Sequence, residues 1–529
     1  MDTKALRQKI LDLAIRGKLV PQDPNDEPAE VLLERIREQK QQMFKEGKLK
    51  KKDIKNDTII FKGEDNLHYE KFQDGTVKCI EDEIPFEVPE GWSWCRLRDL
   101  LNVCSSKRVL QSDWKNEGIP FYRAREIVKL SENDFVENDL FISKEHYLEL
   151  EKNYGIPQSG DLMVSGVGTI GKVYIVKPAD QFYYKDASVL CFENRNKMLV
   201  SKFAKILLES SFVQLQMREN SKGTTVDTIT ISAAMNYLCI VPPQNEQVRI
   251  VAAVQQAIVK VNEIQFNKDN LHSTITILKS KILDLAIRGK LVPQDPNDEP
   301  ASVLLERIRA EKEELIKHGK IKRDKKESVI FKGDDNSYYL RTGGVEESLE
   351  DWRFDDLPET WKICCLWELC DYGDCINVNT EDIAEDAWIL DLEDIEKDTG
   401  TVLKKVAKAQ RNSVSTKHKF HSGQVLYSKL RPYLNKVVLS DADGYCTSEI
   451  LPLEFKNCVL PEYARYYLMS GTFIAYANHC SYGVKMPRLG TTDGKKAIFS
   501  LPPLSEQKRI VETIDFFFMQ LNKISEALA

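Results

Sequence analysis

The sequence predicts an α+β protein in which two mixed α/β domains are joined by long antiparallel coiled-coil helices, with a pseudo-two-fold, circular organisation. Three observations lead to this prediction. The segment Lys9–Arg37 recurs as Lys281–Arg309 with a single change, Ser302 in place of Glu30. A heptad series of apolar residues follows the middle of the chain, and two segments of unlike sequence separate the repeated parts.

Composition limits the classes of protein to which this chain belongs. At 529 residues it is too long for one hydrophobic core. No apolar run is long enough to span a membrane, and Met1–Lys4 opens no signal peptide, so we expect a cytoplasmic protein without a membrane partner. The twelve cysteines lack paired spacing, even in the densest group at Cys364, Cys365, Cys370 and Cys375. Reduced thiols are favoured over a zinc site.

The repeat extends beyond the copied segment. The letters IIFKGEDN (59–66) correspond to VIFKGDDN (329–336), and VPPQNEQVRIV (241–251) corresponds to LPPLSEQKRIV (501–511). Trp92 aligns with Trp361. The segments between these matches, roughly 91–241 and 360–501, differ in length and letters. A solenoid is excluded because two long repeats would leave most stacking faces uncovered.

The constant segments have the signals of helices. Asn245 and Ser505 follow Pro-Pro and are expected as N-caps. The central helix should end near Gly289, and a second helix should begin after Pro28 or Pro300 and reach Gly47 or Gly319. The heptad seam of the central helix consists of Ile250, Val254, Ala257, Val261, Ile264, Leu271, Ile275, Leu278, Ile282 and Leu285.

The partner of this seam is expected to be split between the two chain ends. Residues 510–528 repeat its first half and residues 3–13 repeat its second half. On the central helix, Ala529 corresponds to position 269 and Met1 to position 273. This register predicts a ring with one cut and a pseudo-two-fold axis. An ordinary intramolecular coiled coil would also explain the helices, but it would not explain the paired divergent segments.

The divergent segments are predicted to be mixed α/β, with one helix each near 201–217 and 461–477. A glycine-rich stretch at Gly166, Gly168 and Gly171 partly matches nucleotide-binding patterns. Such patterns need a following helix, whereas Val173–Val176 is typical of a strand, and the corresponding SKLRPYLNKVVLS has no glycine. Two strands joined by a variable loop are favoured, and that loop is a natural recognition element.

Two clusters of basic residues support either a solvated flexible linker or contact with nucleic acid, despite a net charge of −7. They are Lys45, Lys48, Lys50, Lys51, Lys52 and Lys55 in the first half, and Lys317, Lys320, Lys322, Arg323, Lys325 and Lys326 in the second.

This arrangement resembles the specificity (S) subunit of type I restriction-modification systems. The resemblance covers nearly the whole chain and rests on the repeated Pro-Pro-x-x-Glu-Gln step, the repeated Trp-x(4)-Leu opening and the copied AIRGKLVPQDP. The loop GDLMVSGVGTIGKV, which occurs once, adds to it. The Pro-Pro-x-x-Glu-Gln residues are Pro242, Pro243, Glu246 and Gln247, with Pro502, Pro503, Glu506 and Gln507 in the second copy.

The resemblance implies a non-catalytic subunit that recognises a bipartite double-stranded DNA target. Its helices would dock two methyltransferase (M) subunits, which use S-adenosylmethionine to methylate adenine N6. Restriction/translocase (R) subunits would add cleavage that uses ATP and Mg²⁺, so no cofactor or metal is expected in this chain. The implied parts are conserved helices at 1–44, 244–316 and 504–529, and target-recognition domains at 91–243 and 351–503. The basic connectors at 45–90 and 317–350 are extra relative to compact members of the family.

Base and phosphate contacts need arginine, lysine, amide and hydroxyl side chains. For each candidate, an ordinary surface or turn role competes with DNA contact. The DNA-binding candidates are Arg123, Arg125, Ser165, Thr169, Lys172, Lys222, Thr224 and Thr225 in the first domain, and Ser428, Lys429, Arg431, Tyr433, Asn435, Lys436, Lys485 and Arg488 in the second.

Two other classes of function stay open on the sequence alone. One is a coiled-coil scaffold that does not bind DNA. The other is a nucleotide-using enzyme, although the sequence has no full Walker motif, no Asp/Asn-Pro-Pro-aromatic motif and no G-x-S-x-G.

Overall fold

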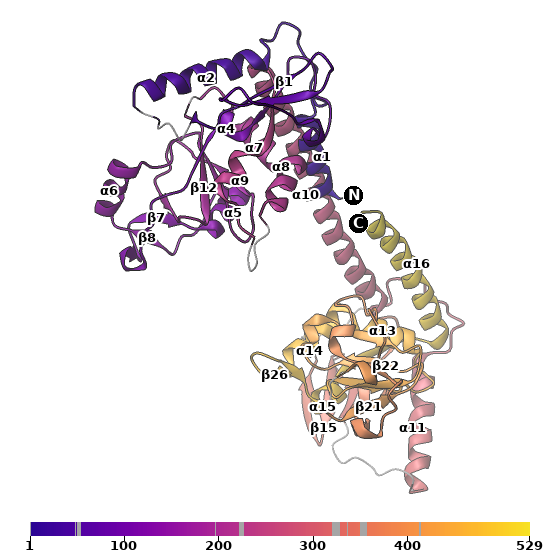
Figure 1. The fold of residues 1–529 in the computed structure, drawn as a ribbon. Helices are drawn as coiled ribbons and strands as arrows, with labels where there is room; N and C mark the ends of the chain where they lie inside the picture. The colour runs from indigo at the N-terminus through magenta and orange to yellow at the C-terminus, as the bar shows by residue number, and fades with distance from the viewer. Residues whose placement is uncertain are drawn as a thin grey trace. The chain divides into compact units, whose positions relative to one another are not determined.

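A computed structural model describes residues 2–47, 49, 54–195, 197–221, 227–319, 328–335, 337–349, 357–411 and 414–528. The chain divides into two compact units, Met1–Asn267 and Lys268–Ala529, and both are drawn in Figure 1. Helix α10 (Gln244–Ala286) begins in the first unit and ends in the second.

The first unit combines several small sheets with short helices. One four-stranded sheet has the order β10-β9-β12-β5 and another has the order β11-β7-β8-β6, while β4 pairs antiparallel with β13. The strands of these sheets are β4 (Ser93–Arg96), β5 (Asn102–Cys104), β6 (Trp114–Lys115), β7 (Ile119–Tyr122), β8 (Phe141–Ile142), β9 (Leu162–Ser165), β10 (Val173–Ile175), β11 (Tyr183–Tyr184), β12 (Val189–Glu193) and β13 (Leu238–Val241).

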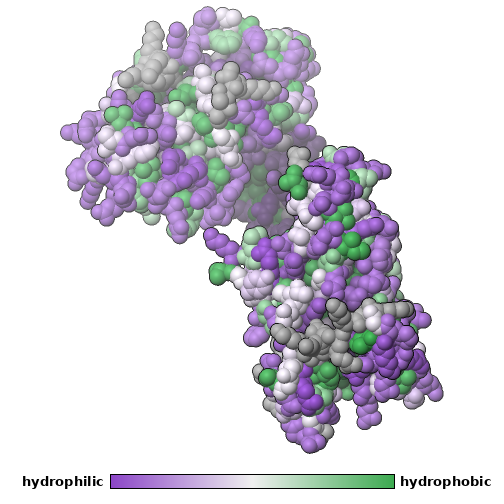
Figure 2. All heavy atoms as spheres, turned by 90° about the horizontal axis from the view of Figure 1, so that it is seen from below, coloured by the Kyte–Doolittle hydropathy of each residue, from purple (hydrophilic) through white to green (hydrophobic). Residues whose placement is uncertain are grey.

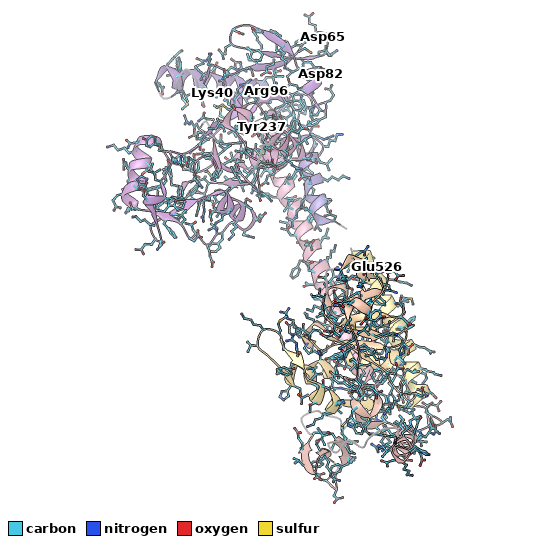
Figure 3. The ribbon with its side chains drawn as sticks, turned by 60° about the horizontal axis from the view of Figure 1, so that its bottom comes forward. Lys40, Asp65, Asp82, Arg96, Tyr237 and Glu526 are labelled. Atoms are coloured by element: carbon cyan, nitrogen blue, oxygen red, sulfur yellow. The ribbon has the colours of Figure 1, made fainter. Side chains whose placement is uncertain are left out.

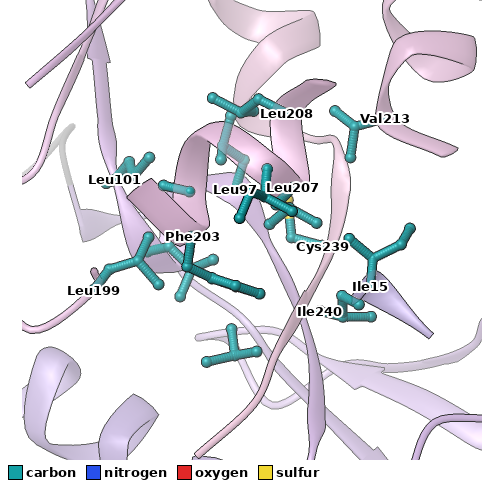
Figure 4. Close-up of a cluster of buried hydrophobic side chains, with 14 of the residues drawn as sticks. Ile15, Leu97, Leu101, Leu199, Phe203, Leu207, Leu208, Val213, Cys239 and Ile240 are labelled. Carbon is teal, nitrogen blue, oxygen red and sulfur yellow. The ribbon is translucent and has the colours of Figure 1, made fainter. Parts of the chain in front are cut away.

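Its main core lies where the helices meet the β4–β13 pair and the sheet that contains β9. Figure 4 shows Phe203 and Leu207 of α7 beside Ile15 of α1 and Ile240 of β13. All four are at most 1% exposed, so the N-terminal helix belongs to the domain core. The helices of this unit, besides α10, are α1 (Thr3–Ile15), α2 (Ala29–Lys45), α4 (Leu97–Leu100), α5 (Ala124–Asn133), α6 (Lys144–Tyr154), α7 (Ser201–Glu209), α8 (Ser211–Glu219) and α9 (Ile231–Met235).

The second unit follows the same plan with different sheets. Its sheets are ordered β18-β21-β24-β19-β20 and β23-β22-β25, and β17 pairs with β28 as β4 pairs with β13. The strands are β17 (Lys362–Cys365), β18 (Ile376–Val378), β19 (Trp388–Leu390), β20 (Val406–Ala407), β21 (Lys417–Phe420), β22 (Val425–Ser428), β23 (Val437–Leu439), β24 (Gly444–Thr447), β25 (Ile450–Leu453), β26 (Ser481–Tyr482), β27 (Arg488–Leu489) and β28 (Ile498–Leu501). The helices are α11 (Ala301–Lys317), α12 (Leu366–Leu369), α13 (Pro461–Leu468), α14 (Gly471–His479), α15 (Thr491–Lys496) and α16 (Leu504–Leu528).

Each copied segment ends its first helix in the same way. The Lys18 N–H donates to Leu13 O at 3.0 Å, and the Lys290 N–H donates to Leu285 O at 2.9 Å. The intervening glycines, Gly17 and Gly289, have φ of 63° and 66°. This is the left-handed C-terminal cap predicted at Gly289, and the predicted second helices, α2 and α11, follow it.

The start of each long helix differs from the prediction. Helix α10 begins at Gln244 and α16 begins at Leu504, so Asn245 and Ser505 lie inside the first turn instead of capping it. The Gln247 N–H donates to Pro243 O at 3.0 Å. Proline therefore occupies the position before the helix, and the polar residue is not needed there.

The single helix predicted in each divergent segment is two helices. Ser210 ends α7, and its side chain accepts the Val213 N–H of α8. Ser470 plays the same part between α13 and α14, where it accepts the Phe473 N–H. A serine side chain that caps a new helix competes with continuation of the old one, which explains the break.

The connectors contain small folded sheets. Strands β1 (Ile59–Lys62), β2 (His68–Lys71) and β3 (Val77–Cys79) form one antiparallel sheet, and β14 (Ser328–Lys332), β15 (Tyr338–Thr342) and β16 (Val345–Ser348) form the other. The connectors are therefore folded over these strands, whereas the flexible-linker interpretation concerned the basic clusters. Most of the basic cluster residues, namely Lys48, Lys50, Lys51, Lys52, Lys320, Lys322, Arg323, Lys325 and Lys326, lie outside the described residues.

The first small sheet is joined to its domain by ion pairs. Arg96 of β4 contacts Glu70 of β2 at 2.7 Å, and Lys40 of α2 contacts Asp57 at 3.2 Å. Figure 3 labels Lys40 and Arg96, together with Asp65 at the outer turn between β1 and β2. Because these charges are buried and paired, the sheet is an integral part of the first unit.

The heptad seam of α10 is only partly buried. Ile250, Val254 and Val261 are buried in the first unit and Ile275 is buried in the second. Ile264, Leu271 and Leu278 are exposed. Leu271 lies between positions 269 and 273, where the predicted register leaves the gap between the two chain ends.

Each unit places a terminal helix along its part of α10. In the first unit, Thr3 of α1 contacts Gln265 and Arg7 contacts Asn262. In the second unit, the contacts of α16 are Asn522 with Lys279 and Ser525 with His272. In both pairs one residue number rises as the other falls, so each terminal helix runs antiparallel to α10.

Candidate nucleic-acid interface

A buried glutamate at the start of each long helix holds the first strand of each divergent domain. The indole N–H of Trp92 donates to Glu246 Oε2 at 2.9 Å, and that of Trp361 donates to Glu506 Oε2 at 2.9 Å. Burial raises the pKa of Glu506 above its ordinary value. The Glu of the Pro-Pro-x-x-Glu-Gln step and the Trp of the opening motif are therefore bonding partners.

The glutamine of the same step holds the start of α7 or α13. Gln247 accepts the Val200 N–H at 3.0 Å, and Gln507 accepts the Leu460 N–H at 2.8 Å. Both glutamines are fully buried. Each domain is thus fixed to its helix at two places by the same residue types, which leaves its loops free to differ in sequence.

In the first unit the variable loop, residues 166–171, joins β9 to β10. Ser165 is fully buried; its hydroxyl donates to Thr169 O at 2.6 Å and accepts the Lys172 N–H at 3.0 Å. Ser165 therefore shapes the loop, while Thr169 is exposed at its tip. Lys172 contacts Glu132 at 3.1 Å. A strand, and not a helix, follows the glycines, as the sequence predicted, which argues against a nucleotide-binding loop.

Two arginines of the first domain lie at the start of α5 and face carboxylates. Arg123 contacts Glu126 at 3.1 Å, and Arg125 contacts both Glu126 and Asp139. Hydrogen bonds that Arg125 donates to these carboxylates, Asp139 first, raise the pKa of its guanidinium group. A phosphate would have to compete with Asp139 for these guanidinium groups. The other candidates of this domain, Lys222, Thr224 and Thr225, lie outside the described residues.

In the second unit the variable loop, residues 429–435, joins β22 to β23 and rests against the hairpin β26–β27. The Arg431 N–H donates to Pro487 O at 2.7 Å, and the Leu489 N–H donates to Lys429 O at 3.0 Å. Arg431 and Asn435 have φ of 51° and 48°, in the left-handed region that non-glycine residues seldom adopt. Loop and hairpin thus form one structural element, which we call the loop–hairpin head (residues 429–435 and 481–489).

The candidates on this head differ in how they are held. Tyr433 and Lys485 are exposed, and Lys429 and Arg431 are half-buried. Arg488 bonds both oxygens of Glu449, at 2.9 to 3.1 Å.

Three other candidates of the second domain have internal roles. Ser428 is buried and donates to Leu430 O at 3.0 Å. Asn435 is buried and its Nδ2 donates to Met469 O at 3.3 Å. The Lys436 Nζ donates to Leu392 O at 2.6 Å, and burial lowers its pKa. As with Ser165, these side chains make hydrogen bonds inside the domain that support the loop.

Sequence reasoning missed three residues of the head. Tyr482, Val484 and Met486 are exposed on the hairpin, on either side of the predicted Lys485. The signal available in the sequence was an apolar residue on each side of a lysine beside a glycine turn, which is also typical of an ordinary strand.

Among the described residues no group of histidine, cysteine, aspartate and glutamate side chains is arranged to hold a metal ion. All twelve cysteines are free. In the same part of the chain, every helix is too short or too polar to cross a bilayer.

Comparison with known families decides between the classes of function. Residues 89–271 and 358–528 match the family model of the type I restriction modification DNA specificity domain. The chain belongs to this family. The two matches correspond to the two divergent domains with their following helices, so this specificity protein carries two DNA specificity domains, and the resemblance inferred from sequence is confirmed.

Curated relatives match over almost the whole chain. The specificity subunit of the type I restriction enzyme EcoAI from Escherichia coli is 28% identical, covering 98% of this chain and 90% of the relative. The EcoEI specificity subunit from Escherichia coli is 26% identical, covering 99% and 90%. A solved chain from work on complex assembly in the type I R-M system has a TM-score of 0.55 at 16% identity, covering 84% of this chain and 94% of that chain. The function is therefore that of a specificity subunit in a type I restriction-modification system.

Proposed function

We propose that this specificity subunit recognises a bipartite duplex target, with each divergent domain contacting one half-site. The observation that carries the proposal is the contrast between two kinds of residue. The Trp92–Glu246 bond has an exact counterpart in Trp361–Glu506, whereas the loops at 166–171 and 429–435 share neither letters nor length. Two domains that are attached to their helices in the same way, but carry different loops, suit a protein that recognises two different DNA sequences.

We further propose that the constant helices form a pseudo-two-fold, circularly organised antiparallel coiled coil that docks two methyltransferase subunits and the restriction subunits. The antiparallel contacts of α1 and α16 with α10 support this arrangement. Its helices keep large apolar side chains exposed, and Figure 2 shows hydrophobic residues among the hydrophilic ones at the surface of both units. Exposed apolar residues on a helix favour a protein partner.

In this proposal the chain itself is non-catalytic and acts in the cytoplasm. S-adenosylmethionine, ATP and Mg²⁺ are used by the partner subunits, and the chain contributes target selection. Turnover by the pure chain that a mutation in this chain abolishes would contradict this part of the proposal.

Duplex binding separates the proposal from a scaffold that does not bind DNA. Affinity of the full chain for duplex DNA should fall steeply with salt concentration, because lysine and arginine contacts release counterions from the phosphates. A scaffold would show no such binding. Fluorescence anisotropy between about 50 and 200 mM salt measures this directly.

Single substitutions in the loop–hairpin head then test the site. Lys429→Ala or Arg431→Ala should either cost about 1–3 kcal/mol at one base pair or weaken all sequences and lower the salt slope by about one. Lys508→Ala, an exposed lysine on α16, is the matched control and should leave both affinity and salt slope unchanged. Unchanged affinity and salt slope in both head variants would place the DNA contacts elsewhere.

A further inference from the structure

The hairpin β26–β27 presents apolar side chains to solvent at a projecting tip. Val484 is 102% exposed, Tyr482 is 63% exposed and Met486 is 45% exposed. Figure 1 shows the hairpin extending from the body of the second unit. Gly483 begins the turn with φ of 98°, a conformation that favours glycine and bends the chain sharply at this point.

The tip is held in a fixed position relative to the variable loop. Leu430 and Arg488 form a β-bridge, and the bonds from the Arg431 N–H to Pro487 O and from the Leu489 N–H to Lys429 O lie on either side of it. Glu449 accepts hydrogen bonds from the Arg488 guanidinium through both of its carboxylate oxygens. Arg488 is therefore a positioning residue, since much of its hydrogen-bonding capacity is directed at Glu449.

The charges around the tip favour a polyanion as its partner. Lys485 lies between Val484 and Met486, and Lys429 and Arg431 are on the adjoining loop. A two-stranded β-ribbon fits the major groove of B-DNA. The apolar group that this groove presents is the C5-methyl of thymine. Valine and methionine side chains have no hydrogen-bond donor for the polar base edges, so this methyl group is the contact that suits them.

We propose that Val484 and Met486 contact thymine C5-methyl groups in the half-site recognised by the second domain, while Lys485 and the adjoining loop hold the phosphates. This inference rests on the proposed function and adds specificity-determining residues to it. The tip contributes apolar discrimination of A·T pairs, and the loop contributes polar contacts. Because Val484 and Met486 are exposed, their truncation to alanine leaves the core of the second unit intact.

The test combines base substitution with protein substitution. Methylome sequencing of a host that expresses the complete system first gives the target. Each thymine of the second half-site is then replaced singly by deoxyuridine, which removes only the C5-methyl group, and the affinity of the full chain is measured by anisotropy. Loss of one buried methyl group should weaken binding about fourfold at one or more positions.

The same duplexes are then measured with Val484→Ala and Met486→Ala. At least one variant should bind the thymine and deoxyuridine duplexes equally at the sensitive position, with an unchanged salt slope. Leu403→Ala, which truncates another exposed apolar residue of the second unit, is the matched control and should keep the fourfold preference. Thermal melting of each variant verifies that the fold is retained.

Two outcomes distinguish failure of this inference from failure of the proposed function. A chain that binds no duplex DNA contradicts the proposed function itself. A chain that binds duplex DNA with a normal salt slope, but shows no deoxyuridine-sensitive position or keeps its thymine preference in both variants, overturns the methyl contacts alone. Variants that bind DNA normally but lose a partner subunit would assign the tip to protein docking and would also overturn the inference.

Discussion

Single side chains determine how firmly each recognition domain is held to its helix. Glu506 is fully buried and accepts hydrogen bonds from Trp361 and from the Gln294 side chain, the latter at 2.6 Å. Both bonds favour the ionised carboxylate, but burial outweighs them and raises its pKa. The attachment therefore contains a group whose charge is costly in the folded state.

We predict that Glu506→Gln changes the pH dependence of stability. Since the folded-state pKa lies above the ordinary value, the folded chain binds the extra proton, and the contribution of Glu506 falls as pH rises from about 4.5 through the raised pKa. The loss is about 1.4 kcal/mol for each unit by which the pKa is raised. The glutamine variant should lack this loss, relative to wild type, in thermal melts between about pH 4 and 8. Parallel stability curves for the two proteins would show that Glu506 does not titrate in this way.

At the level of single residues, the sequence identified the residues of each attachment but not which of them bond to each other. Glu246, Gln247 and Trp92 were all recognised as repeated letters, yet only the structure shows that the tryptophan bonds the glutamate. In the same way, Ser165 was a plausible donor to DNA until its burial placed its hydroxyl inside the loop. Spacing along the chain does not tell which way a loop side chain points.

At the scale of elements, both units attach the divergent domain to its long helix in the same way, although the sheets of the two domains differ. The β4–β13 and β17–β28 pairs are equivalent, whereas the sheets they carry differ in strand number and order. We therefore expect a substitution that weakens the attachment in one unit to destabilise that unit and to leave the other unchanged.

We predict that Trp361→Phe destabilises the second unit by about 1–3 kcal/mol, because it leaves a buried carboxylate oxygen without its donor. Trp92→Phe is the matched variant and should have the same effect on the first unit. Hydrogen exchange followed by mass spectrometry should show faster exchange near β17 and β28 in one variant and near β4 and β13 in the other. Faster exchange in both units of either variant would mean that the attachments are not independent.

Helices were predicted well where long apolar periodicity and glycine caps coincide, as in α2, α10 and α11. The breaks at Ser210 and Ser470 were not predicted. A serine within a helical pattern can lie inside the helix or cap a new one, and the sequence pattern does not distinguish the two. The small sheets were missed because their strands follow basic runs, and charge obscured the period-two pattern.

At the scale of the whole molecule, exposed apolar residues on α10 are the clearest candidate for assembly. Ile277 is 68% exposed, and Phe516 and Phe517 of α16 are exposed in the same unit. Ile277 lies beside the predicted heptad seam, between Ile275 and Leu278, and heptad periodicity does not identify a partner for it.

We predict that Ile277→Glu keeps the chain folded but weakens its assembly with the methyltransferase subunits at least tenfold, since a charge would be buried in an apolar interface. Ser280→Glu, also exposed on α10, is the control and should assemble normally. Co-purification at several subunit concentrations measures the difference. Normal assembly of the Ile277 variant would assign docking to another surface.

The most direct test of two separate recognition domains is a domain exchange read by methylome sequencing. Residues 91–241 are replaced by the corresponding domain of another type I specificity subunit, and the complex is expressed in a host without other methyltransferases. The boundaries follow β4 and β13, so Glu246 and Gln247 stay in place, and the incoming domain has to supply the counterparts of Trp92 and Val200. We predict that one half of the methylated target changes while the other half stays the same. A target in which both halves change, or neither does, would contradict it.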